Sequence, residues 1–262
     1  MDEAVLAVRR EVIGMPDKKR IALVTGASSG LGREFARLLA HEAVDELWLV
    51  ARRGERLREL SAELAVPCRI FALDLTQEAA LEELSEALSA EPPVVRYLVN
   101  AAGFGRIGMA EDIGAATTGC MIALNCRAAA ELTERALPYM ERGSRVLEIA
   151  SCAAFQPIPY LAAYAATKAF LLRYSRALAA EVAARGITVT AICHTGSATR
   201  SSSTRRSRRT RRGCSAASRS RRTRRPSRGA RSGPPSTALP SSRPTSSRLC
   251  TASSHPSCRT AS

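Results

Sequence analysis

Short apolar segments alternate with longer segments of mixed polarity along most of the chain. The apolar segments are hydrophobic at nearly every position, which is typical of strands covered on both faces of a parallel sheet. They are IALVTG at 21–26, ELWLVA at 46–51, CRIFALD at 68–74, VRYLVNAA at 95–102, RVLEIAS at 145–151 and ITVTAIC at 187–193.

In the intervening segments, Ala and Leu recur at helical spacing among Glu and Arg. These predicted helices lie at 30–42, 54–64, 77–90, 116–141 and 161–185. The alternation of strand and helix predicts an α/β fold with a doubly wound parallel sheet, a Rossmann-type arrangement of three α/β/α layers. Because crossovers are right-handed, few topologies remain, and we expect the strand order 3-2-1-4-5-6.

The composition changes abruptly after Cys193. Residues 1–193 carry 22 Lys and Arg against 24 Asp and Glu, whereas residues 194–262 carry 17 Arg, 19 Ser and no acidic residue. Only two large apolar residues occur in that last segment, too few to offset the entropy of ordering it. We therefore expect an N-terminal extension (1–19), a folded domain (20–193) and a disordered tail (194–262).

Several classes of protein are disfavoured by the composition. No apolar run approaches the roughly 18 residues of a membrane span, and the start, MDEAVLAVRR, does not resemble a secretory signal. The eight Cys residues form no CxxC pair, so neither a disulfide framework nor a metal site is expected. We expect a cytoplasmic protein that does not associate with membranes.

A glycine-rich turn follows the first predicted strand and leads into the first predicted helix. Such a turn brings the backbone close to a pyrophosphate, and the free N–H groups of the helix point at the phosphates. The context of strand, turn and helix favours a dinucleotide site over a glycine turn without a ligand. The candidate residues are Thr25, Gly26, Ser28, Ser29, Gly30, Leu31 and Gly32.

This turn matches the motif TGxxxGxG in full, and from about residue 20 to Cys193 the chain resembles the short-chain dehydrogenase/reductase family. The resemblance implies an enzyme that interconverts a carbonyl and an alcohol with a nicotinamide cofactor. Relatives that prefer NAD usually carry an acid at the end of the second strand, where this chain has Ala51 followed by Arg52 and Arg53. Guanidinium groups bind a 2′-phosphate, so we expect NADP(H) rather than NAD(H), unless both arginines are solvated loop charges.

Two further strand ends complete the expected cofactor site. The resemblance implies that Asp74, followed by Leu75, accepts a hydrogen bond from the adenine; alternatively, Asp74 caps the next helix, a role for which Thr76 competes. The fourth strand ends in NAAG, where the family form is NNAG. There, Asn100 is expected to brace the sheet, and the small residues Ala101, Ala102 and Gly103 leave room for the adenosine.

The sequence YAATK places Tyr164 and Lys168 on one helix face, thirteen residues after Ser151 at the end of the fifth strand. Hydride transfer to a carbonyl leaves an alkoxide that needs a proton, and an ammonium beside a phenol favours the phenolate. We expect Tyr164 to be the general acid/base, Lys168 to support it and to bind the nicotinamide ribose, and Ser151 to hold the substrate oxygen. The resemblance implies that Asn125 links the lysine to solvent through water.

The surroundings of this constellation indicate the substrate and the assembly. Phe155 and its neighbours through Ile158 are expected to line a mouth for an apolar small molecule. In relatives, the helices that correspond to 116–141 and 161–185 form a dimer interface, so a homodimer or homotetramer is expected.

The segment after Cys193 departs from the family, which continues there with Pro-Gly, a loop over the nicotinamide, a helix and a seventh strand. If one C is inserted after the Cys193 codon, the reading frame of the following codons shifts. Codons that encode the present residues can then be read as Cys-Pro-Tyr-Trp-Val-Arg-Asp-Thr-Glu-Phe-Ile. We therefore interpret the residues from His194 onward as the product of a shifted reading frame, which leaves the seventh strand missing and the enzyme impaired.

Two alternatives remain open. The Arg-rich tail is suited to binding nucleic acid through phosphates, without base specificity because it has no aromatic residue. Otherwise, the chain is a nucleotide-binding protein without turnover.

Overall fold

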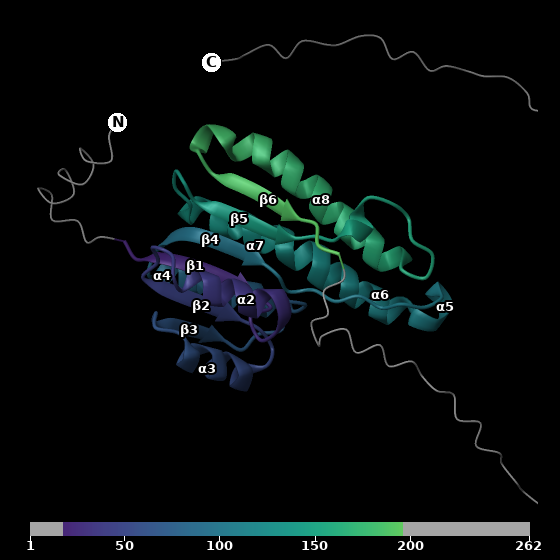
Figure 1. Cartoon of the computed structure of the whole chain (residues 1–262), viewed down its shortest axis with the longest axis horizontal. Helices are drawn as coiled ribbons and strands as arrows, with labels where there is room; N and C mark the ends of the chain where they lie inside the picture. Colours follow the sequence, from purple (N-terminus) through teal and green to yellow (C-terminus); the bar gives the residue numbers. More distant parts are fainter. Residues whose placement is uncertain (1–17, 196–262) are drawn as a thin grey trace, which may run out of the picture. The chain divides into compact units, whose positions relative to one another are not determined.

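The computed structural model describes residues 18–195, in which a parallel sheet lies between helices (Figure 1). The strands are β1 (Arg20–Thr25), β2 (Glu46–Val50), β3 (Cys68–Phe71), β4 (Val94–Asn100), β5 (Arg145–Ile149) and β6 (Thr188–Ile192). The α-helices are α2 (Gly30–Leu39), α3 (Gly54–Glu63), α4 (Glu78–Ala90), α5 (Ala110–Ile113), α6 (Ala115–Ile122), α7 (Ala129–Ala136) and α8 (Ala162–Val182). The shorter turns are η1 (Ala123–Ala128, a π-helix) and the 3₁₀ turns η2 (Leu137–Tyr139), η3 (Cys152–Ala154) and η4 (Ala183–Arg185).

All neighbouring strands pair in parallel, in the order β3-β2-β1-β4-β5-β6. The predicted doubly wound fold and strand order are therefore confirmed. All six predicted strands are present. The third is shorter than expected: it ends at Phe71, and Ala72–Asp74 have no regular secondary structure.

Two layers of apolar side chains cover the two faces of the sheet. Leu39 of α2 and Leu60 of α3 pack on one face, whereas Leu84 of α4, Leu132 of α7 and Leu178 of α8 pack on the other. The connections thus divide between the faces, which brings the carboxyl ends of β1 and β4 together at the point where the strand order reverses.

The edge strands are less covered than expected. In β6, Val189 is buried while Thr188 and Thr190 are exposed, and in β3 Arg69 lies outside, over the Trp48 ring. The prediction that every strand is covered on both faces is therefore wrong for β3 and β6, because each has a neighbour on one side only within residues 18–195.

The helix predicted over 116–141 is divided. The π-helix η1 separates α6 from α7, and the short helix α5, which the pattern did not predict, precedes them. A π-turn holds one residue more than an α-turn and is frequent at functional sites. Asn125 lies within it, fully buried.

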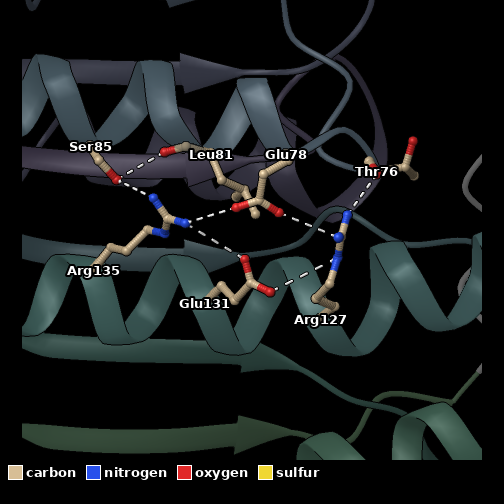
Figure 2. Close-up of polar contacts among 7 residues, drawn as sticks. All are labelled: Thr76, Glu78, Leu81, Ser85, Arg127, Glu131 and Arg135. Carbon is tan, nitrogen blue, oxygen red and sulfur yellow. Dashed lines mark hydrogen bonds and ion pairs between the residues drawn. The ribbon is translucent and has the colours of Figure 1, made fainter.

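A polar cluster joins α4 to the α7 segment across one face of the sheet (Figure 2). Arg127 and Arg135 both reach Glu78, at 3.4 and 3.1 Å. Arg135 also donates to the Ser85 hydroxyl at 2.9 Å, and Arg127 donates to the Thr76 carbonyl at 2.7 Å. The last bond fastens the β3–α4 turn to the helix that carries Asn125.

The predicted extension (1–19) and tail (194–262) lie almost wholly outside the described residues, as does any structure after Thr195. Across residues 18–195, none of the helices combines the length and apolar character that crossing a bilayer requires.

Candidate active site

Two glycines at the turn between β1 and α2 leave no room for a side chain of their own. Gly26 has a φ of +69°, and a Cβ there would lie 2.8 Å from the backbone of Ala101 and Ala102. A Cβ on Gly32 would lie 2.5 Å from the Gly26 carbonyl oxygen. The turn therefore packs directly on the end of β4, and α2 begins beside it at Gly30, with its first N–H groups directed out of the turn.

Thr25 links the two central strands at this edge. Its hydroxyl donates to the Val99 carbonyl at 3.3 Å and accepts from the Ala102 N–H at 3.1 Å. The side chain is buried, so its role in the described structure is to fix the distance between the glycine turn and the NAAG segment.

Arg53 lies over the glycine turn, whereas its neighbour Arg52 makes no such contact. One Arg53 Nη atom donates to the hydroxyls of Ser28 and Ser29, at 3.0 and 2.9 Å. Burial, and then the charges of Arg56 and Arg52, lower the pKa of Arg53. A cation is thus held beside a turn that is rich in hydroxyl groups, at the end of β2.

Asp74 bonds to Thr76 and does not cap the next helix, the alternative that the sequence left open, because the N-cap of α4 is Gln77. Its Oδ1 accepts from the N–H and the hydroxyl of Thr76, at 3.0 and 2.8 Å. Burial opposes ionisation, but these bonds and the charge of Arg52 lower the pKa of Asp74. The carboxylate shapes the turn before α4, whose N-cap residue is Gln77; a contact with adenine stays a prediction. Leu75 is buried in the core beneath.

Tyr164 and Lys168 lie together in the first turns of α8. The Lys168 Nζ is 5.9 Å from the Tyr164 ring centroid and donates to the Ile149 carbonyl at 2.5 Å. The side chain of Lys168 is only 5% exposed. Burial lowers its pKa to about 8, although the negative charge of Glu148 works in the opposite direction.

Asn125 joins three segments around this pair. Its Oδ1 accepts from the Phe104 N–H at 3.0 Å, and its Nδ2 donates to the Phe104 carbonyl at 2.9 Å and to the Thr167 hydroxyl at 3.0 Å. A Cβ on Gly103 would lie 3.0 Å from Asn125 Oδ1 and 3.5 Å from Lys168 Nζ. The NAAG segment therefore passes directly beside both side chains.

Ser151 follows β5 at the same edge. It is buried and caps η3, where its hydroxyl accepts from the Ala153 N–H at 3.2 Å. Because Lys168 bonds to Ile149, two residues before Ser151, the end of β5 and the face of α8 that carries Tyr164 are tied together.

A cavity of about 290 Å³ opens beside the start of α8. It lies between the segment around α5 and the segment that leads into α8, which are joined by a 2.9 Å bond from the Gly108 N–H to the Tyr160 carbonyl. Phe155 and Ile158, which were expected to line the substrate mouth, are absent from its walls. The lining residues are Gly108, Met109, Ala110, Ile113, Thr118, Pro159, Tyr160, Ala162 and Ala163.

The sequence analysis missed Glu148, which is fully buried in β5. Its signal was present: Glu148 is the only charged residue in the run VLEIA, and such a run predicts a strand covered on both faces. A charged residue there must find buried partners.

Each of these groups lies at the carboxyl edge of the sheet or on a helix that borders it. The Tyr164 phenol, the buried Lys168 ammonium and the glycine turn thus lie where open α/β sheets bind their ligands.

Comparisons with known proteins agree with this arrangement. A family model described as short chain dehydrogenase matches residues 20–210. An uncharacterised oxidoreductase of Staphylococcus epidermidis is 29% identical over 177 residues, which cover 67% of this chain and 76% of that protein.

Two solved structures share the fold. A short-chain dehydrogenase from Sphingobium yanoikuyae in complex with NADPH is 30% identical, with a TM-score of 0.63 over 69% of this chain and 72% of the other. A 3-ketoacyl-(acyl-carrier-protein) reductase from Brucella melitensis, complexed with NADH, is 29% identical, with a TM-score of 0.63 over 70% and 78% of the two chains.

Proposed function

The chain belongs to the short-chain dehydrogenase family and is an oxidoreductase that uses a nicotinamide cofactor, and from this premise we propose that it reduces a carbonyl on an apolar small molecule with NADPH. The observation that carries the proposal is the grouping of Tyr164, Lys168 and Asn125 beside Gly103, next to the glycine turn.

The residues at the sheet edge fit a dinucleotide. The turn at Gly26 and Gly32 is a cradle that any Cβ would fill, and the start of α2 offers N–H groups to a pyrophosphate. Asn100, Ala101, Ala102 and Gly103 form the opposite wall, and Asp74 with Leu75 the far end. When bound, the cofactor supplies the hydride that reduces the carbonyl carbon.

The chain's own residues handle the proton. Tyr164 donates it to the oxygen of the reduced carbonyl, and the buried ammonium of Lys168 stabilises the phenolate that remains. Ser151 orients the substrate oxygen. Asn125 holds the loop at Phe104 against Lys168 and Tyr164 through its paired bonds to that backbone.

Arg53 supports a preference for NADPH. Its guanidinium group already lies against Ser28 and Ser29, and an arginine at this strand end accommodates a 2′-phosphate. Because the solved relatives include complexes with both NADPH and NADH, the preference rests on this contact.

The apolar cavity beside α8 supports an apolar substrate. Its walls include Met109, Ile113 and Tyr160 but no charged side chain, so an apolar substituent is favoured there. Exposed Ile122 and Phe170, on α6 and α8, support association of these helices into a homodimer or homotetramer.

The proposal is tested by comparing the wild type with Tyr164→Phe. NADPH is expected to quench the fluorescence of the wild type, which is also expected to reduce apolar ketones. Tyr164→Phe is expected to bind NADPH with unchanged affinity and to lose turnover. Tyr139→Phe, a change of the same kind at a partly buried tyrosine in η2 that packs on the core and does not line the cavity, serves as the control. Normal turnover by Tyr164→Phe would refute the assignment.

The chain as it stands and a version with one C restored after the Cys193 codon are assayed in parallel. We propose that the frame-restored version is the more active, because the segment from His194 onward then supplies the substrate loop. Nucleotide binding without turnover in both would favour a non-catalytic binding protein. A salt-sensitive gel shift that disappears on removal of residues 196–262 would favour nucleic-acid binding.

A further inference from the structure

Glu148 is a buried acid that the proposed reaction does not use. It lies near the carboxyl end of β5, with 0% of its surface exposed, and Asn100 of β4 and Thr133 of α7 surround it. Both of these residues are also buried. The next residue along the strand, Ile149, is the one whose carbonyl accepts from Lys168.

The contacts in this cluster require more hydrogens than its amide and hydroxyl provide. The Asn100 Nδ2 has two hydrogens and lies 2.7 Å from Glu148 Oε1, 2.8 Å from Thr133 Oγ1 and 3.3 Å from the Ala129 carbonyl. The Thr133 hydroxyl has one hydrogen and lies 2.8 Å from the Ala129 carbonyl and 2.9 Å from Glu148 Oε1. Three hydrogens therefore face five contacts.

A proton on Glu148 supplies the hydrogen that the 2.9 Å contact between Glu148 Oε1 and the Thr133 hydroxyl lacks, and of the five contacts it leaves only the longest, from Asn100 Nδ2 to the Ala129 carbonyl at 3.3 Å, without a hydrogen. Glu148 then donates to the Thr133 hydroxyl, and Thr133 donates to the Ala129 carbonyl. If the amide of Asn100 is turned over, its oxygen lies 2.7 Å from Glu148, a distance that also needs a proton between the two oxygens.

The second oxygen of the carboxyl group gives an independent reason. Glu148 Oε2 is buried without a hydrogen-bond partner among residues 18–195. An ionised carboxylate in that position would leave a charged oxygen unsolvated, which is far more costly than an unpaired oxygen of a neutral acid.

We propose that Glu148 is a neutral acid in the folded protein below neutral pH, and that its ionisation adds a buried negative charge that holds Lys168 in its protonated form. Glu148 is thus a positioning residue for Lys168. Its effect on catalysis rests on the proposed function, whereas its protonation does not.

The surrounding charges agree with this assignment. Burial raises the pKa of Glu148 to about 7, opposed by the bonds from Asn100 and Thr133 and by the charge of Lys168 on α8. Tyr174, also on α8, is the other titratable group whose electrostatics include Glu148. The pKa of Glu148 is thus raised and that of Lys168 lowered, so both are brought toward neutral pH.

Infrared spectroscopy tests the proton directly. The wild type at pH 6 is expected to show the carbonyl band of a buried carboxylic acid, which disappears as the pH passes about 7. Glu148→Gln, which keeps the shape and supplies amide hydrogens to Thr133, is expected to lack the band; exposed Glu83→Gln is expected to retain it. A band equally strong in Glu148→Gln overturns the proposal.

Thermal unfolding gives a second readout. An acid whose pKa is raised in the folded state contributes stability below its unfolded pKa and loses it as the pH rises through the folded value. The Tm of Glu148→Gln minus that of the wild type should therefore rise between pH 5 and pH 8. A difference that does not change with pH would mark a purely structural residue and overturn the proposal.

The charge of Lys168 is followed by NMR, through the ¹³C shift of its Cε, assigned with Lys168→Met. In Glu148→Gln the Lys168 titration is expected to move to lower pH, and an unmoved midpoint contradicts the positioning role. None of these readouts requires turnover, so they decide the inference even if the proposed function fails. Should Glu148→Gln not fold, Thr133→Val is expected to shift the acid band in an otherwise native chain, and an unshifted band overturns the assignment.

Discussion

Gly105 lies against the ring of the proposed proton donor. A Cβ at this position would be 2.7 Å from Cδ2 of Tyr164, a distance at which the ring must move. The absence of a side chain at residue 105 therefore sets where the phenol lies, as much as the helix that carries it.

We predict that Gly105→Ala lowers turnover and reduces the free energy of unfolding by about 1–3 kcal/mol, the usual cost of overpacking. Gly119→Ala is the control, because a Cβ there meets nothing within 4 Å and alanine favours its helix by about 0.5–1 kcal/mol. Denaturant titration and ketone reduction measure the two effects. Equal turnover in both variants would contradict the role of Gly105.

Arg53 permits a test of cofactor choice. A bond between a guanidinium group and a phosphate contributes about 1.5–3 kcal/mol, so Arg53→Ala, alone or with Arg52→Ala, should weaken NADPH binding by about 10- to 150-fold and leave NADH binding nearly unchanged. Arg58→Ala is the control, because it removes a cation from α3, the helix that Arg53 precedes, and within residues 18–195 its ion pair is with Glu55. Fluorescence titration with both cofactors measures the ratio, and a constant ratio would count against NADP preference.

Single residues also show where prediction from sequence ended. The positions of Tyr164 and Lys168 followed from their spacing on one helix, which fixes a common face. The contacts of Asn125 with Phe104 could not be predicted in this way, because the two residues are 21 positions apart and lie in a helix and a loop. The protonation of Glu148 depends on hydrogens contributed from three elements, which no local pattern contains.

Among the elements, the cluster in Figure 2 links the β3–α4 turn to the packing of α4 against the α7 segment. Its individual ion pairs are partly exposed and contribute little to stability. The bond from Arg127 to the Thr76 carbonyl differs, because it holds the turn that carries Asp74. We therefore expect this bond to affect the affinity for a nucleotide more than the free energy of unfolding.

We predict that Arg127→Met weakens NADPH binding several-fold, whereas Arg135→Met, which loses contacts with Glu78 and Ser85 but none with that turn, does not. Both variants should lose a similar free energy of unfolding, about 1 kcal/mol. Calorimetric titration distinguishes them. If both bind alike, the turn is held by Asp74 and Thr76 without Arg127.

Element boundaries were predictable where apolar periodicity coincided with turn residues, as at Gly26 before α2. The pattern did not reveal η1, since the residues of a π-turn are as apolar as those of a helix. The exposure of β6 escaped prediction for another reason: strand coverage depends on neighbours, and Thr188 and Thr190 read as ordinary strand residues.

At the scale of the whole molecule, β6 borders the sheet within residues 18–195. Leu147 and Ile192, on the face covered elsewhere by α2 and α3, are only partly buried. If further residues packed on Leu147 and Ile192, the apolar surface that they bury would stabilise the fold by about 25 cal/mol per Å². They would also cover the open edge of β6.

We predict that restoring one C after the Cys193 codon raises the Tm and reduces concentration-dependent aggregation. Differential scanning calorimetry and light scattering measure these changes. A chain with an arbitrary 69-residue polar tail after Cys193 is the control, and it should behave like the present one. Identical melting of all three would refute the interpretation of a shifted frame.

The π-turn at Ala123–Ala128 sets how far α6 is rotated relative to α7 about the helix axis. A π-turn takes up one residue more than an α-turn, and each α-helical residue advances about 100° around the axis. The same residues wound as a continuous α-helix would therefore rotate α6 by about that angle against α7. Met121, now fully buried, would leave the interior. An irregularity of one residue thus keeps the inward faces of both helices aligned while Asn125 stays on Phe104.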